Sequence, residues 1–269
     1  MAILRRRHNP AGRMSLGDHL RELRNRLTVA LIAIVAGGVV GWLLYDPLLT
    51  TLSEPLLALG RRRGSDMVTL NFAGVTTAFS LKLKVSLFVG VILASPVWLY
   101  QVWAFIVPGL TRREKRTAMA FVAAAVPLFV GGCYLATWAL PKAVEVLLGF
   151  TPTGATNLQN ASDYLDFVTR FILAFGLAFL LPVFLVMLNV AHVLPARVML
   201  KGWRVAVMLI FVFAAMMTPT PDAWTMLALA FPMIALYFGA VGVAALIDRR
   251  RHRDQPDWSG LSDDEASTL

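Results

Sequence analysis

Six apolar runs dominate the chain and leave little of it for a soluble domain. Most of them approach the length of about 20 residues that crosses a bilayer as a helix. Hydrophobic residues make up 58% of the 269 residues and charged residues only 15%, whereas soluble domains average about 45–50% and about 25%. The sequence therefore predicts an all-α, polytopic membrane protein. The predicted spans are Thr28–Tyr45, about Ala78–Val107, Thr117–Leu140, about Tyr164–Leu188, about Trp203–Met217 and Ala223–Ile247.

Two of these runs are unusual. The second carries Lys82 and Lys84 near its start, where lysines can reach the membrane interface, and Pro96 in its middle, which predicts a long, bent helix. The fifth, Trp203–Met217, rises only about 22 Å, less than the hydrocarbon core of about 30 Å. The bilayer is expected to thin there, or a partner to shield this helix.

Small residues predict close packing inside the bundle. Gly37 and Gly41 are spaced for close helix approach, and packing within the chain is favoured over self-association. The single cysteine, Cys133, lies in an apolar run and is expected to be a small buried residue. One cysteine excludes a disulfide scaffold and any CxxC site.

The distribution of basic residues predicts the orientation. Of the 25 lysines and arginines, 18 lie in the two terminal segments and in two of the predicted loops. With six spans, these four segments lie on the same side of the membrane. By the positive-inside rule, both termini are cytoplasmic, although Arg61–Arg63 run against the trend. Charge arranged this way suits a membrane better than a nucleic acid. Three regions follow: a cytoplasmic amphipathic segment 1–27, a spanning domain 28–247 and a disordered cytoplasmic tail 248–269.

Motifs for catalysis are missing from the sequence. There is no GxSxG, HExxH or Walker A string, and the four histidines do not cluster, so neither an enzyme nor a cofactor or metal is expected. Asp166 and Arg170 are spaced to pair on one helix face. The other deep positions are apolar, which counts against a small-solute transporter or channel, the main alternative. An intramembrane enzyme, the third possibility, would need a catalytic dyad.

Several ordered strings together resemble one family. HLRELRNRL covers His19–Leu27, SPVWLYQVWAFIVPGLTRREKR covers Ser95–Arg116, and DYLDFVTRFILAFGLAFLLPV covers Asp163–Val183. TPTPD follows at Thr218–Asp222. At this spacing they resemble TatC, the six-span receptor of twin-arginine protein translocation, over roughly Met14–Ile247.

The resemblance implies a function and partners. TatC-like proteins bind twin-arginine signal peptides of folded precursors at the cytoplasmic face. They work with single-span partners of the TatA and TatB type, in multi-copy hetero-oligomers of the bacterial cytoplasmic membrane. The proton-motive force drives export. A concave bundle of six helices, without a cofactor, is the fold that the resemblance implies.

Two acidic residues carry the expected binding site. Glu22 and Glu114 match the family's arginine-binding glutamates, and each is an acid within a basic cluster. A carboxylate can bind a guanidinium through two parallel hydrogen bonds. Pairing with neighbouring arginines on the helix surface is the alternative role. Arg24 matches a basic position that would orient Glu22, and Leu27 and Phe105 match positions near the site.

Other positions are assigned only by the resemblance. Pro55 matches a proline of the first outer loop, and Asp222 an acid of the last outer turn, where capping the sixth helix is an equal alternative. Leu180 stands where many members carry an intramembrane glutamate, and Met226 where some carry a glutamine. A partner helix is expected at Met217, Thr218, Thr220 and Met226.

Overall fold

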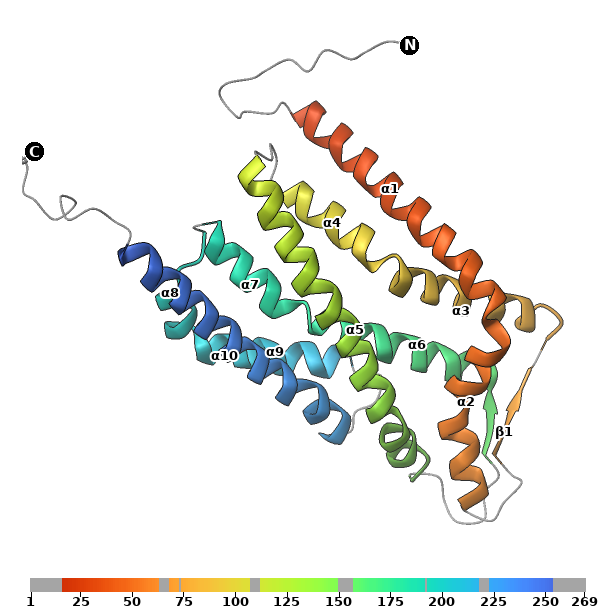
Figure 1. Ribbon diagram of the computed structural model, residues 1–269. Helices are drawn as coiled ribbons and strands as arrows, with labels where there is room; N and C mark the ends of the chain where they lie inside the picture. Colours follow the sequence, from red (N-terminus) through yellow and green to blue (C-terminus); the bar gives the residue numbers. More distant parts are fainter. Residues whose placement is uncertain are drawn as a thin grey trace, which may run out of the picture. The chain divides into compact units, whose positions relative to one another are not determined.

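The computed structural model is helical almost throughout the residues that it describes (Figure 1). These residues are 16–62, 68–72, 74–106, 112–149, 157–191, 193–217 and 223–253. The helices are α1 (Leu16–Leu43), α2 (Tyr45–Arg62), α3 (Thr77–Leu93), α4 (Ser95–Ile106), α5 (Arg112–Gly149), α6 (Ala161–Ala178), α7 (Leu181–Val190), α8 (Ala196–Lys201), α9 (Trp203–Met217) and α10 (Ala223–Arg253). The strands are β1 (Val68–Asn71) and β2 (Asn157–Asn160).

The chain divides into two compact units. The first comprises Met1–Leu57, Thr69–Pro127 and Leu158–Leu165. The second comprises Ala58–Val68, Leu128–Asn157 and Asp166–Leu269. Helices α2, α5 and α6 contribute residues to both units.

Glycines set the contact between α1 and α3 in the first unit, where the two helices lie side by side (Figure 1). A Cβ atom on Gly90 would lie 2.3 Å from the Ile34 carbonyl oxygen, and one on Gly41 would lie 2.6 Å from the Ser86 carbonyl oxygen. A Cβ on Gly37 would lie 3.0 Å from Gly90. The backbones therefore approach too closely for side chains, which confirms the packing predicted from Gly37 and Gly41.

The predicted bend at Pro96 is present. α3 ends at Leu93 and α4 begins at Ser95, and their axes differ by 62°. Proline has no N–H to donate, and its ring clashes with the preceding turn, so the helix breaks there. The Trp98 indole N–H donates to the Val91 carbonyl oxygen across the break at 2.9 Å. This bond joins the two halves in a defined geometry.

Lys82, inside the predicted second span, lies against aromatic rings. Its Nζ atom is 4.8 Å from the centroid of the Trp42 ring and 5.3 Å from that of Tyr45. A cation over an aromatic face is stabilised by the ring quadrupole, by about 0.5–2 kcal/mol depending on solvation. The charge thus contributes to the contact of α3 with α1 and α2.

Two features of the structure were not expected from the sequence. β1 and β2 pair as a two-stranded sheet. Pro55, which the resemblance assigned to the first outer loop, lies inside α2, a helix of 18 residues. The buried Tyr164 hydroxyl donates to the Leu52 carbonyl oxygen at 2.9 Å, which holds α6 against α2.

Close packing recurs between α5 and α6 in the second unit. A Cβ on Gly132 would lie 2.7 Å from the Phe175 carbonyl oxygen, and one on Gly176 would lie 2.7 Å from Cys133 Sγ. Cys133 is buried, as predicted. Small residues thus allow the phenylalanines of α5 and α6 to fill the remaining space, with Phe129, Phe171 and Phe175 almost fully buried.

A carboxylate near the C-terminal end of α10 links three helices. Asp248 Oδ1 accepts from Asn189 Nδ2 at 3.0 Å, and Oδ2 accepts from the backbone N–H of Ala196 at 2.9 Å. Asn189 Nδ2 also donates to the Leu194 carbonyl oxygen at 3.1 Å. Asp248 therefore connects α10 to the end of α7 and the start of α8.

The described helices include four that are long and apolar enough to cross a membrane. They lie within Gly17–Leu43, Ala118–Gly149, Ala161–Val190 and Ala223–Arg250, and the bent pair α3–α4 can make a fifth. α9 has the predicted bounds and is a shorter apolar helix. The structure thus supports an all-helical membrane protein with four to five candidate spans, and six remains a prediction.

Candidate functional site

Glu22 is held by an arginine of its own helix. Arg26 donates through Nε to Glu22 Oε1 at 3.0 Å, and its Nη2 contacts the same oxygen. From the resemblance, Arg24 was expected to orient Glu22. In the structure the guanidinium at Glu22 belongs to Arg26, because residues four apart lie on the same helix face and residues two apart do not. Arg24 and Leu27 are exposed.

The second oxygen of Glu22 is in a different environment. Oε2 is buried and accepts no hydrogen bond from any residue that the structure describes, and only 20% of the Glu22 side chain is exposed. An unpaired buried carboxylate oxygen costs more free energy than a neutral group. Among the described residues, none donates a hydrogen bond to this second oxygen.

Two contacts connect this face of α1 to α4. The Arg26 Nη1 atom lies 3.5 Å from Gln101 Oε1, and the His19 ring stacks on Phe105 with centroids 4.6 Å apart. The earlier residue of α1 meets the later residue of α4, so the two helices run antiparallel here. Phe105, assigned by the resemblance, thus lies beside the helix that carries Glu22. Gln101 and His19 were not singled out from the sequence.

α4 also contacts the N-terminal part of α5. The rings of Trp103 and Phe121 stack with centroids 5.0 Å apart, and both are buried. Trp103 Nε1 is buried, and no described residue accepts a hydrogen bond from it. Glu114 lies in the first turn of α5, about two helical turns before Phe121. Its side chain is outside the described residues, and the backbone places it in the same unit as Glu22.

The remaining sequence-assigned residues belong to other segments of the chain. Pro55 is half-buried within α2, and Met226 is half-buried in α10. Met217 is the last residue of α9, and its side chain is outside the described residues, as are Thr218, Thr220 and Asp222 altogether. Leu180, in the place of the family's glutamate, is buried. Among the residues described, no group of three His, Cys, Asp or Glu could hold a metal ion.

The spacing of residues along each helix could have indicated some of the residues that sequence reasoning missed. His19, Glu22 and Arg26 are spaced by three and four residues, so the pattern places them on one face of α1. Gln101 and Phe105 share a face of α4 by the same rule. Nothing in the sequence indicates that these two faces meet.

Comparison with known proteins identifies the family. The family model described as "Sec-independent protein translocase protein (TatC)" matches residues 18–232. A TatC protein of Xylanimonas cellulosilytica is 53% identical over 90% of this chain and 87% of its own length, and one of Frankia casuarinae is 40% identical over 96% and 73%. A crystal structure of the twin arginine translocase receptor TatC in DDM is 33% identical, with a TM-score of 0.70 over 84% of this chain and 99% of that one. The chain is a multi-pass membrane protein that belongs to the TatC family of Sec-independent protein translocase subunits, which are not enzymes.

Proposed function

We propose that this chain is the receptor that binds twin-arginine signal peptides of folded precursors at the cytoplasmic face of the membrane. Glu22 and Glu114 bind the paired arginines, and Phe105 and Leu27 contact apolar parts of the peptide. The chain then recruits single-span partners of the TatA and TatB type, and the proton-motive force drives export.

The observation that carries this proposal is the guanidinium already bound to Glu22. Its Oε1 accepts from Arg26, and its buried Oε2 accepts no hydrogen bond within the described part of the chain. The carboxylate therefore binds the functional group that two consecutive arginines would present. A charge-assisted hydrogen bond contributes about 1.5–3 kcal/mol when shielded, and an exposed ion pair only about 0.2–1 kcal/mol. For the half-buried Glu22 we expect about 1–2 kcal/mol, which is roughly 5- to 30-fold in affinity.

Crosslinking of a precursor to membranes containing this chain tests the proposal. Glu22→Gln or Glu114→Gln should weaken capture of a twin-arginine precursor about 5- to 30-fold. A twin-lysine precursor should bind more weakly than the twin-arginine one, because lysine lacks the bidentate fork. Glu145→Gln, an exposed acid on α5, is the control. If the double variant Glu22→Gln, Glu114→Gln captured the precursor at the wild-type level, this site would be excluded.

The orientation is part of the proposal and rests on the distribution of basic residues. Both termini are placed in the cytoplasm, with six spans between them. Cysteine labelling from outside intact cells separates the two orientations, with buried Cys133 as the native background. Glu145→Cys should react and Arg21→Cys should not; the reverse would refute the orientation.

The partner site proposed at Met217, Thr218, Thr220 and Met226 rests on the resemblance and on the length of α9. This helix has 15 residues, and many of its apolar side chains are exposed, among them Val205, Met208, Leu209, Val212 and Met216. A photo-crosslinker at position 217 should capture a single-span partner. Capture only from α1 or α5 would place the partner elsewhere.

A further inference from the structure

The carboxylate proposed to bind the signal peptide is closed in this structure. Glu22 Oε1 is bound by Nε and Nη2 of Arg26, and Oε2 is buried. Both residues are mostly covered, with about a fifth of each side chain exposed. An arginine arriving from outside therefore finds neither oxygen open.

Arg26 presents the same guanidinium that a ligand arginine would bring. The two cannot bind the same oxygen with the same geometry. Arg26 also has a second acceptor within reach, because its Nη1 lies 3.5 Å from Gln101 Oε1 on α4. This distance exceeds the usual 2.9–3.0 Å of an N–H···O bond, so a small movement of the side chain would shorten it. A neutral amide is a weaker acceptor than a carboxylate, which explains why Arg26 rests on Glu22 when no ligand is bound.

We propose that Arg26 is an internal placeholder for the signal-peptide arginine. It occupies Glu22 in the unliganded receptor, and the peptide arginine displaces it toward Gln101. This inference rests on the proposed function, since it requires Glu22 to be the peptide-binding carboxylate. Arg26 is a positioning residue in this scheme, because it acts on the ligand through Glu22. The alternative is that both arginines share Glu22, with the peptide on Oε2.

The placeholder has a quantitative consequence. A receptor whose binding-competent state is only partly populated binds every ligand more weakly by that fraction. Removing Arg26 should therefore strengthen binding by one common factor for all ligands of Glu22. Exposed ion pairs at this spacing change an equilibrium about twofold, and the partly buried two-nitrogen contact here should do more. We expect a factor of roughly 3–10.

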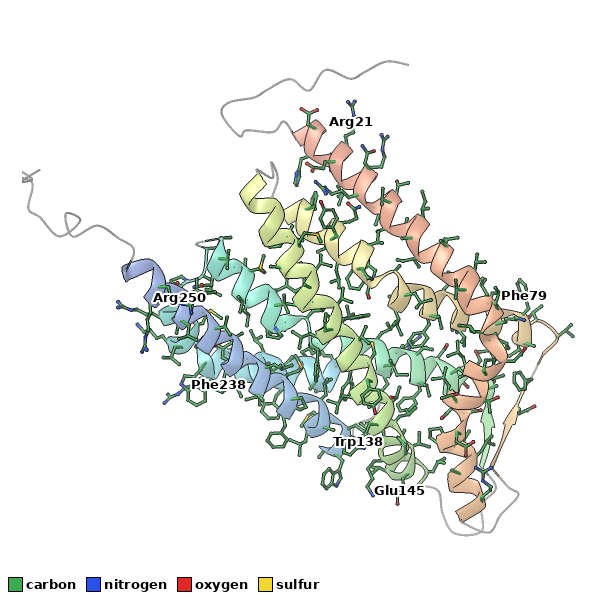
Figure 2. The ribbon with its side chains drawn as sticks, in the orientation of Figure 1. Arg21, Phe79, Trp138, Glu145, Phe238 and Arg250 are labelled. Atoms are coloured by element: carbon green, nitrogen blue, oxygen red, sulfur yellow. The ribbon has the colours of Figure 1, made fainter. Side chains whose placement is uncertain are left out.

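Equilibrium binding to the purified full-length protein in nanodiscs tests this. The probe is a fluorescent synthetic peptide with two consecutive arginines followed by an apolar segment, together with its twin-lysine variant. Arg26→Gln should strengthen the binding of both peptides by the same factor of roughly 3–10. Arg26→Lys should strengthen it about twofold, because lysine competes less well than arginine for a carboxylate. Arg21→Gln is the charge-matched control on the exposed side of α1 and should change binding less than twofold (Figure 2).

Variants at Glu22 distinguish a failure of this inference from a failure of the proposed function. In a Glu22→Gln background, Arg26→Gln should have no further effect on binding, since there is no carboxylate to release. If Glu22→Gln alone binds the peptides like the wild type, both the proposed site and the placeholder role of Arg26 are refuted. If Glu22→Gln weakens binding but Arg26→Gln also weakens it or leaves it unchanged, the site stands and the placeholder is refuted. Should Arg26→Gln fail to yield a folded protein, the Arg26→Lys arm decides by the same criteria.

Discussion

The contact of α1 with α3 at Gly90 leaves no room for a methyl group. The added Cβ would lie 2.3 Å from the Ile34 carbonyl oxygen and 2.7 Å from the Gly38 nitrogen, whereas ordinary contacts begin at 3.4 Å. Both atoms belong to helix backbone, so the helices must separate by about 1 Å. Overpacking of this kind costs about 1–3 kcal/mol. We expect Gly90→Ala to lower the unfolding midpoint by about 3–9 °C, at roughly 3 °C per kcal/mol for a chain of this size.

Neighbouring glycines supply matched controls for this variant. A Cβ on Gly38 would meet nothing closer than 3.5 Å, so Gly38→Ala should leave the midpoint within about 1 °C. Gly41→Ala should fall in between, because its Cβ would lie 2.6 Å from the Ser86 carbonyl oxygen. The protein in detergent is heated to a series of temperatures, and size-exclusion chromatography measures the fraction that remains monodisperse. The midpoint of this loss is compared between the variants. Equal midpoints for Gly90→Ala and Gly38→Ala would refute the reasoning.

Two further predictions concern hydrogen bonds between helices, one group partly buried and one buried, and are measured in the same assay. Asp248→Ala removes the acceptor of Asn189 Nδ2 and of the Ala196 N–H and should lower stability by about 1–3 kcal/mol. The control Glu145→Ala, at an exposed acid, should lower it by less than about 0.5 kcal/mol, and similar losses of stability in the two variants would contradict the proposed role of Asp248. Tyr164→Phe removes the buried bond to Leu52 and should cost about 1 kcal/mol, and an equal effect of Tyr134→Phe, at an exposed tyrosine, would argue against it.

Local signals located most of the helices. Pro96 placed the break between α3 and α4, and the short apolar run Trp203–Met217 became α9 with the same bounds. These features depend on residues close in sequence, such as a missing N–H or a run of apolar side chains. The ends of the helices were predicted less accurately. The third span was predicted as Thr117–Leu140, but α5 covers Arg112–Gly149, because charged residues can continue a helix beyond its apolar part.

The pairing of β1 with β2 was missed for a related reason. Each strand has only four residues, and β2 reads NLQN, which has no run of β-branched or aromatic residues. Such a strand is stabilised by its partner, and the partner is distant in sequence. Patterns within one segment do not reveal that distance.

The sequence by itself determined that this is a helical membrane protein of the TatC family, and it singled out Glu22 and Phe105. Apolar length, proline positions and ordered motifs are local properties that can be read without a fold. Helical spacing already puts Arg26 on the same face of α1 as Glu22, and only the tertiary structure decided that Arg26 also reaches Gln101, 75 residues away. Helical periodicity establishes which side chains share a face. It does not establish which face of another helix they meet, because that depends on how closely glycine backbones such as Gly90 let the helices approach.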